Sequence, residues 1–197
     1  MDKDNMKSND NSQLKFINAL SRREAIQIIL ALCKDLDMLE RISTMAKSSL
    51  SDVVAAEIAD EVFECLNSIQ VEGLWNNSGQ TSWGYQDPTE VAFEMIEDEV
   101  QHYIRKMEQY RNLGIKAEEK ECCKGIISGL LRYGEAGNNE FRDWCPDDPY
   151  TVVENIIYDW KNDHTPEEVE EIQTFYDGFF SDNEEEAARE AAESAKE

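Results

Sequence analysis

The residues most suited to metal chemistry are the two histidines, and their surroundings are poor for a metal centre. Glu99 and His102 form one Glu-x-x-His pair, whereas di-metal centres in helical bundles use such pairs on two helices. His164 lies in a predicted turn and supplies no second pair. An enzyme with a metal site in the core of a bundle stays open as an alternative, but the sequence leads us to expect no metal and no cofactor.

The five cysteines fit neither a zinc site nor a disulfide framework. Cys122 and Cys123 are adjacent, and adjacent side chains on a helix point about 100° apart, unlike the Cys-x-x-Cys spacing of structural zinc sites. Cys145 precedes a proline in a predicted turn, with no glycine turn beside it that could form an oxyanion hole. We expect buried or half-buried thiols in the cytoplasm, and a redox or metal role for these three stays open.

Residues 74–90, LWNNSGQTSWGYQDPTE, combine amides, hydroxyls and aromatic rings without a helical pattern. We expect a long ordered loop without secondary structure at 76–87, acting either as a structural lid over the core or as a recognition site. A second aromatic group follows near residues 141–160. The candidate interaction surface consists of Trp75, Asn77, Trp83, Tyr85, Trp144 and Tyr150.

Matched capping residues predict where several helices begin. The pairs are Ser21 with Glu24, Asp87 with Pro88, Asp148 with Pro149, and Thr165 with Glu168. Ser51 is the expected cap of another helix, and Gly114 is expected to end the longest one. Apolar residues recur at helical spacing between these points, and no long stretch alternates with period two. The predicted fold is therefore all-α.

The helices are expected to pair in chain order, giving an irregular helical bundle or a short stack of helix hairpins. In this scheme the first two helices pair, and the helix after Ser51 pairs with the helix after Asp87. Gly125 and Gly129 lie four apart within one predicted helix. Because glycine weakens a helix, we expect these two positions to let a neighbouring helix approach closely.

Length and composition predict one domain with polar ends. We expect a disordered leader at 1–13, a single helical domain at 14–181 and an acidic Ala/Glu-rich tail at 182–197, a frayed helix or a mobile segment. The formal net charge is −24, which disfavours direct binding to nucleic acid or to anionic membranes and favours basic protein partners. No run of residues is apolar over the length needed to cross a bilayer.

Several phrases, among them SGQTSWGYQDPTEVAFEMIED and NLGIKAEEKECCKGIISGLLRYGEAGNNEFRDW, resemble an uncharacterised helical region associated with prokaryotic SWIM-type zinc-finger proteins. The resemblance covers residues 20–161 and implies a helical, repeat-like accessory domain. The metal-binding CxC…CxH pattern of that family is absent, so zinc and nucleic-acid binding are not implied here.

These observations predict a protein-protein interaction or scaffold module with a strongly acidic surface. An alternative is a nucleic-acid mimic that occupies the basic cleft of a nucleic-acid-binding protein. The partner, the biological process and the oligomeric state are left open by the sequence.

Overall fold

The computed structural model describes residues 15–82 and 84–194, without the side chains of Thr81 and of residues 181–194. The chain divides into two compact units between Asp52 and Val53, where the sequence predicted one domain over 14–181. The all-α prediction is confirmed, since a two-stranded pairing is the only sheet in the described part of the chain. The predicted leader at 1–13, the side chain of Trp83 and residues 195–197 of the predicted tail lie outside the described residues.

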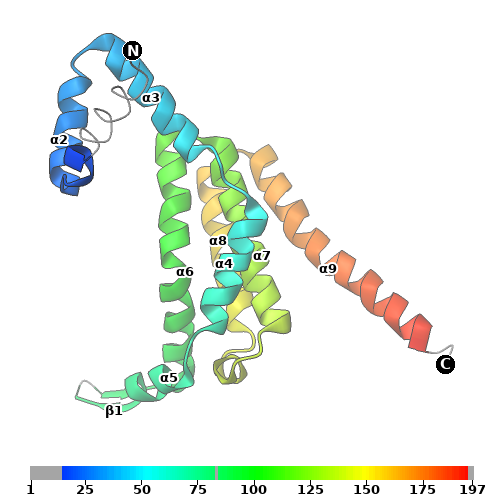
Figure 1. The fold of residues 1–197 in the computed structure, drawn as a ribbon. Coiled ribbons are helices and arrows are strands. Elements are labelled where there is room, and N and C mark those ends of the chain that lie inside the picture. Colours follow the sequence, from blue (N-terminus) through cyan, green and yellow to red (C-terminus); the bar gives the residue numbers. More distant parts are fainter. Residues whose placement is uncertain (1–14, 83, 195–197) are drawn as a thin grey trace, which may run out of the picture. The chain divides into compact units, whose positions relative to one another are not determined.

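In the described part of unit 1, a helical turn at 15–18 is followed by α2 (Arg22–Leu32) and α3 (Leu36–Leu50). The predicted capping box at the start of α2 is confirmed, because Ser21 Oγ accepts from the Glu24 backbone N–H while Glu24 accepts from Ser21 N–H at 2.9 Å. The predicted pairing of these two helices as a hairpin is wrong, because they hardly contact each other. Neither helix contains a buried residue, and the two diverge from their short connection (Figure 1).

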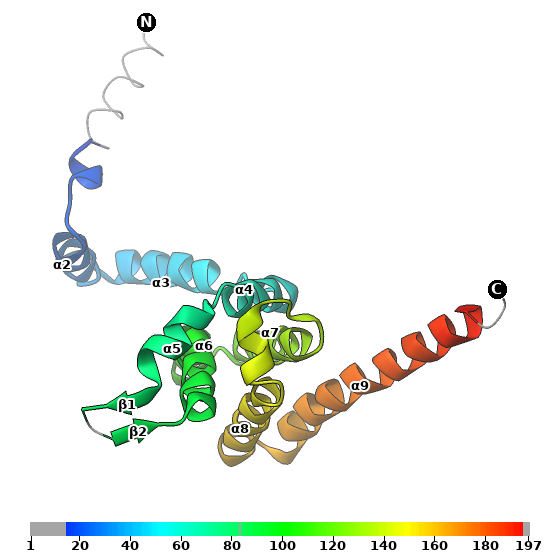
Figure 2. The ribbon, with the colours of Figure 1, turned by 90° about the horizontal axis from the view of Figure 1, so that it is seen from below.

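Unit 2 is a helical bundle built around one central helix. In chain order its elements are α4 (Ala55–Asn67), α5 (Val71–Asn77), β1 (Gly79–Thr81), β2 (Gly84–Gln86), α6 (Pro88–Leu113), α7 (Lys116–Ala136), the 3-10 helix η1 (Glu140–Trp144), α8 (Asp148–Asp163) and α9 (Pro166–Ser194). Helix α7 lies between α4, α6 and α8 in the view of Figure 2 and also contacts α9. It carries more buried residues than the other described helices, which makes it the core of the unit.

The two glycines in α7 bring α4 against its backbone, as expected from their spacing. A Cβ at Gly125 would lie 2.6 Å from Ile58 Cβ, and a Cβ at Gly129 would lie 2.6 Å from Val62 Cβ. Real Cβ atoms do not approach this closely, so only glycine allows the contact. The predicted pairing of α4 with α6 is therefore wrong, because α4 packs mainly on α7.

Most predicted helix ends are confirmed. Asp87 accepts from the Thr89 backbone N–H at 2.9 Å ahead of Pro88, and Gly114 ends α6 with a φ of 69°. Thr165 and Glu168 also exchange the predicted capping bonds.

Two predicted helix starts differ from the structure. Ser51 ends α3 instead of starting the next helix, and α4 begins after Val54 without a side-chain cap. Helix α8 begins one residue early, so Asp147 is its N-cap and Pro149 stands at its second position.

The prediction of a loop without secondary structure at 76–87 is also wrong. The last turn of α5 reaches Asn77, and β1 and β2 then pair antiparallel as a short hairpin, with Gly79 opposite Gln86. Gly79 and Gly84 adopt φ values of 85° and 130°, in the region that favours glycine. Three-residue strands are too short to show a period-two pattern, which explains why the sequence did not reveal them.

Helix α9 starts on the bundle and continues through Ser194, into the segment predicted as an acidic tail. Ile172 of α9 is fully buried, and Glu171 forms ion pairs with Lys120 and Lys124 of α7 at 2.8 and 3.1 Å. The first turns of α9 are thus part of unit 2. Among the described helices, none has the length and apolar character that crossing a membrane requires.

The glycine contact predicts opposite effects for two Gly→Ala substitutions. Gly129→Ala places a methyl group against Val62 and the Ala59 backbone, so we expect a loss of about 1–3 kcal/mol in the free energy of unfolding. Gly178→Ala in α9 meets no atom within 4 Å and should leave stability unchanged or raise it by up to about 1 kcal/mol. Urea denaturation measures both; equal effects would contradict the packing account.

Candidate functional site

A buried carboxylate lies where α6, α7 and the α8–α9 connection meet. Glu119 of α7 is 2% exposed, and its Oε1 accepts from Arg111 Nε at 2.7 Å and lies 3.0 Å from His164 Nε2. A buried carboxylate is costly unless charged or hydrogen-bonding groups surround it. Glu119 has both, so it holds Arg111 and His164 in fixed positions.

Both ring nitrogens of His164 face oxygen atoms of neighbouring residues. Its Nδ1 lies 3.0 Å from the Trp160 carbonyl oxygen, and its Nε2 lies 3.0 Å from Glu119 Oε1. These two contacts fix the orientation of the ring. The Trp160 ring stacks on the imidazole at a centroid distance of 3.6 Å and shields it.

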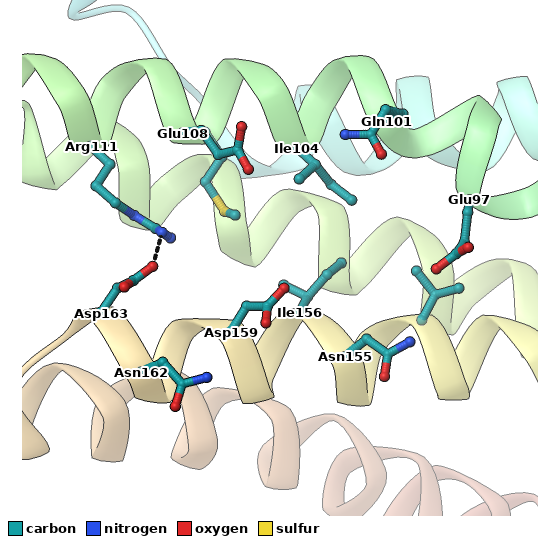
Figure 3. A pocket seen from close by; sticks show the side chains of 12 residues that line it. Glu97, Gln101, Ile104, Glu108, Arg111, Asn155, Ile156, Asp159, Asn162 and Asp163 are labelled. Carbon is teal, nitrogen blue, oxygen red and sulfur yellow. Dashed lines mark hydrogen bonds and ion pairs between the residues drawn. The ribbon is translucent and has the colours of Figure 1, made fainter.

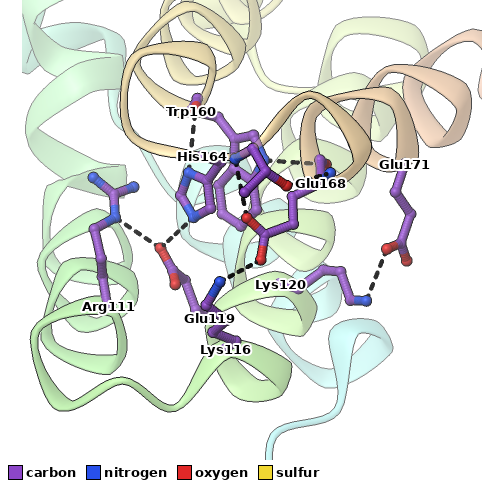
Figure 4. Close-up of polar contacts among 9 residues, drawn as sticks. Arg111, Lys116, Glu119, Lys120, Trp160, His164, Glu168 and Glu171 are labelled. Carbon is purple, nitrogen blue, oxygen red and sulfur yellow. Dashed lines mark hydrogen bonds and ion pairs between the residues drawn. The ribbon is translucent and has the colours of Figure 1, made fainter.

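Ion pairs surround this buried group and connect α7 to α9 (Figure 4). Lys116 Nζ lies 2.7 Å from Glu168 Oε1, beside a hollow of about 170 Å³ that Glu119 and His164 also line. Hydrogen bonds from Lys116 and from the Thr165 backbone N–H lower the pKa of Glu168 to about 2. The charged groups here contact one another, so we interpret them as a structural clamp. The clamp consists of Arg111, Lys116, Glu119, His164 and Glu168.

A larger groove of about 460 Å³ runs between α6 and α8 (Figure 3). Its volume is within the usual range of ligand sites. Side chains of the two helices face each other across it: four carboxylates, three amides, four apolar side chains and one guanidinium. They are Glu97, Glu108, Asp159 and Asp163; Gln101, Asn155 and Asn162; Ile104, Met107, Val152 and Ile156; and Arg111.

The charge in this groove is unbalanced. Arg111, the one cation in its lining, donates to Glu119 through Nε and forms an ion pair with Asp163 through Nη1. Glu97, Glu108 and Asp159 form no ion pair within the described part of the chain. The groove therefore presents three uncompensated carboxylates.

Glu97 has a raised pKa for local reasons. Burial raises the pKa of its carboxyl group, and the negative charges of Asp98 and Glu94 on the same helix raise it further. Both effects disfavour the ionised form, and a cation bound nearby would oppose them. The groove is thus chemically suited to a positively charged ligand.

The structure brings together two residues of the predicted interaction surface and separates the rest. The rings of Trp75 and Trp144 meet edge to face at 4.6 Å and are 46% and 38% exposed. Tyr85 is exposed on β2, and Tyr150 lies elsewhere, against Gly134 and the ring of Phe180.

Two more residues of that surface need separate mention. Asn77 uses its side chain to donate to the Gly73 carbonyl oxygen at 2.9 Å within α5. Trp83 lies outside the described residues. Trp75 and Trp144 are therefore the described members of the predicted surface that form a ring contact, and the interaction surface itself stays a prediction.

The three cysteines considered for chemistry are buried. Burial raises the pKa of Cys122 to about 11 and that of Cys145 to about 12, and it raises that of Cys123 further still. Raised pKa values keep these thiols protonated and make them poor nucleophiles. In the described residues, no three His, Cys, Asp or Glu side chains form a group that could hold a metal ion.

The sequence did not reveal the groove or the clamp. Glu97 was noticeable only as one carboxylate among several at helical spacing, and Arg111 as part of an otherwise apolar face. The signal that was available is the series Glu97, Gln101 and Glu108 on one side of its helix and Asn155, Asp159 and Asn162 on one side of another. The sequence does not show that these two helix faces lie opposite each other, because that depends on the tertiary packing.

The clamp predicts that Glu119 is important for stability. Glu119→Ala leaves Arg111 and His164 without their shared acceptor, so we expect the free energy of unfolding to fall by about 3 kcal/mol. Glu118→Ala, next in the helix, removes a carboxylate outside the clamp and should change it by no more than about 0.5 kcal/mol. Chemical denaturation distinguishes the two, and equal losses would refute the clamp.

The Glu168 contacts predict a pH dependence. Because its folded pKa of about 2 lies below the ordinary 4.5, the stabilisation it contributes is present above pH 4.5 and is lost as pH falls toward 2. Lys116→Ala should move this pKa back toward 4.5, as measured by NMR titration of the side-chain carboxyl carbon. A wild-type value already at 4.5 would show that the Lys116–Glu168 contact does not persist in solution.

Comparison of the chain with protein-family models, with curated proteins and with solved structures finds no match. The likeness to the helical region of SWIM-type zinc-finger proteins therefore stays a prediction.

Proposed function

We propose that the protein is an interaction module whose helical unit 2 binds a basic segment of a partner protein in the groove between α6 and α8. The observation that carries the proposal is the charge imbalance of that groove. Three carboxylates lack a cationic partner there, because Arg111 is occupied by Glu119 and Asp163.

The lining suits lysine and arginine side chains in particular. Their charged ends would meet the carboxylates on both walls, while their methylene stems would lie on the apolar floor of Ile104 and Ile156. The amides of Gln101, Asn155 and Asn162 can both donate and accept, as the backbone of an extended peptide requires. A groove open along two helices also accepts a chain more readily than a closed pocket does.

The charge of the whole protein supports the same partner. A net charge of −24 attracts a basic protein over a distance and raises the rate of encounter. The same charge repels nucleic-acid phosphates from the groove. All five cysteines are free thiols, which is consistent with the reducing cytoplasm as the compartment of this interaction.

A fluorescein-labelled peptide that alternates lysine with serine tests the proposal by fluorescence anisotropy. We expect it to bind, and to bind more weakly as salt rises, whereas a glutamate–serine peptide should not bind. The triple variant Glu97→Gln/Glu108→Gln/Asp159→Asn should weaken binding at least about tenfold, because each lost charge pair contributes about 1 kcal/mol or more.

The matched control is Glu64→Gln/Glu154→Gln/Glu170→Gln, which removes three exposed carboxylates outside the groove lining. It should change the affinity by no more than about twofold, consistent with a small screened contribution from distant surface charges. If the control weakens binding as much as the groove variant does, the peptide responds to overall charge and the groove is not the site. Absence of binding at low salt would equally overturn the proposal.

A further inference from the structure

Unit 1 exposes the apolar side chains that its sequence pattern marks for burial. In α2, the exposed large apolar residues are Ile26, Ile28, Ile29, Leu30 and Leu32. In α3, Leu36 is 81% exposed, Met45 69% and Leu39 41%. Neither helix has a buried residue.

The pattern of α2 is that of an interior helix. After its first turn, Gln27 is the one polar residue up to Leu32, so apolar side chains surround the helix axis. Helices that are apolar all round are normally buried, and exposed apolar surface on this scale marks an interaction site. The two helices also hardly contact each other, so residues 15–52, the described part of unit 1, form no core of their own.

The charge of unit 1 indicates what covers it. Residues 1–52 hold 8 of the 19 Lys and Arg and 8 of the 43 Asp and Glu, so the net charge of −24 falls entirely on residues 53–197. Two copies of this chain repel each other wherever their acidic parts would meet. An interface built from unit 1 carries none of that repulsion itself.

Unit 1 carries both signs of charge side by side. Arg22 and Arg23 stand next to Glu24 at the start of α2, and Lys34 and Arg41 flank Asp35, Asp37 and Glu40 at the start of α3, with all eight side chains exposed. In a two-fold interface each patch meets its own counterpart, so a surface with both signs can pair with itself.

From these observations we propose that a second copy of the chain covers unit 1. The α2 and α3 helices of two copies pack together as a four-helix arrangement and bury the apolar residues of both. This inference does not depend on the proposed function, because the groove lies wholly in unit 2. A dimer would carry two grooves and so bind a partner with repeated basic segments more tightly.

Sedimentation equilibrium of the full chain, at protein concentrations on the order of 100 µM, tests the proposal. We expect a mass of twice 22.7 kDa for the wild type. Leu30→Glu/Leu39→Glu places charges in the apolar surface and should halve that mass. Because neither side chain is buried, thermal unfolding of unit 2 should be unchanged.

The charge-matched control is Gln109→Glu/Asn112→Glu on α6, where both side chains are exposed, and it should remain dimeric. A wild type that sediments at 22.7 kDa overturns the proposal. If the apolar variant of such a monomer also unfolds at a lower temperature, α2 and α3 are covered by the chain's own unit 2 instead. A variant that remains dimeric would place the contact between copies outside unit 1 and overturns the proposal as well.

Discussion

The close contact between α4 and α7 determines how the rest of unit 2 is arranged. With glycine at positions 125 and 129, the α7 backbone touches Ile58 and Val62 of α4 directly. Each glycine costs about 1 kcal/mol of helix propensity, which the packing must offset. Because α4 takes this side of α7, the remaining sides are left for α6, α8 and α9. The helix is therefore buried along most of its length, and Glu119 near its start is buried with it.

The burial of Glu119 connects the fold to the groove. A buried carboxylate requires cationic or hydrogen-bonding partners, and Glu119 obtains them from Arg111 on α6 and His164 after α8. This use of Arg111, together with its ion pair to Asp163, removes the one positive charge that could balance the groove lining. The negative charge of the groove thus follows from the use of Arg111 as a partner of the buried Glu119 and of Asp163. The opposite arrangement, in which Arg111 pointed freely into the groove, would suit a much less basic partner.

Local features of this protein could be predicted from sequence, and pairings between distant elements could not. The caps at Ser21, Asp87 and Thr165 and the end of α6 at Gly114 depend on neighbouring residues alone, so their chemistry is visible in the chain. Ser51 was wrongly predicted as the start of a helix, because a serine between two helices can belong to the end of the first or the start of the second, and here it ends α3.

The spacing of Gly125 and Gly129 correctly predicted that another helix approaches closely, but which helix it is depends on long-range packing. The groove and the Trp75–Trp144 pair depend in the same way on which elements meet. The apolar pattern of α2 correctly predicted a helix, and none of its residues is buried within the described part of unit 1.

Binding of a positively charged peptide between α6 and α8 can be tested by mapping backbone amide chemical shifts while the full chain is titrated with the lysine–serine peptide. We expect the largest changes on both walls, at residues 97–111 and 152–163, and we expect them to vanish at high salt. Changes confined to the surface around Trp75 and Trp144, or spread evenly over all acidic helices, would contradict binding in this groove.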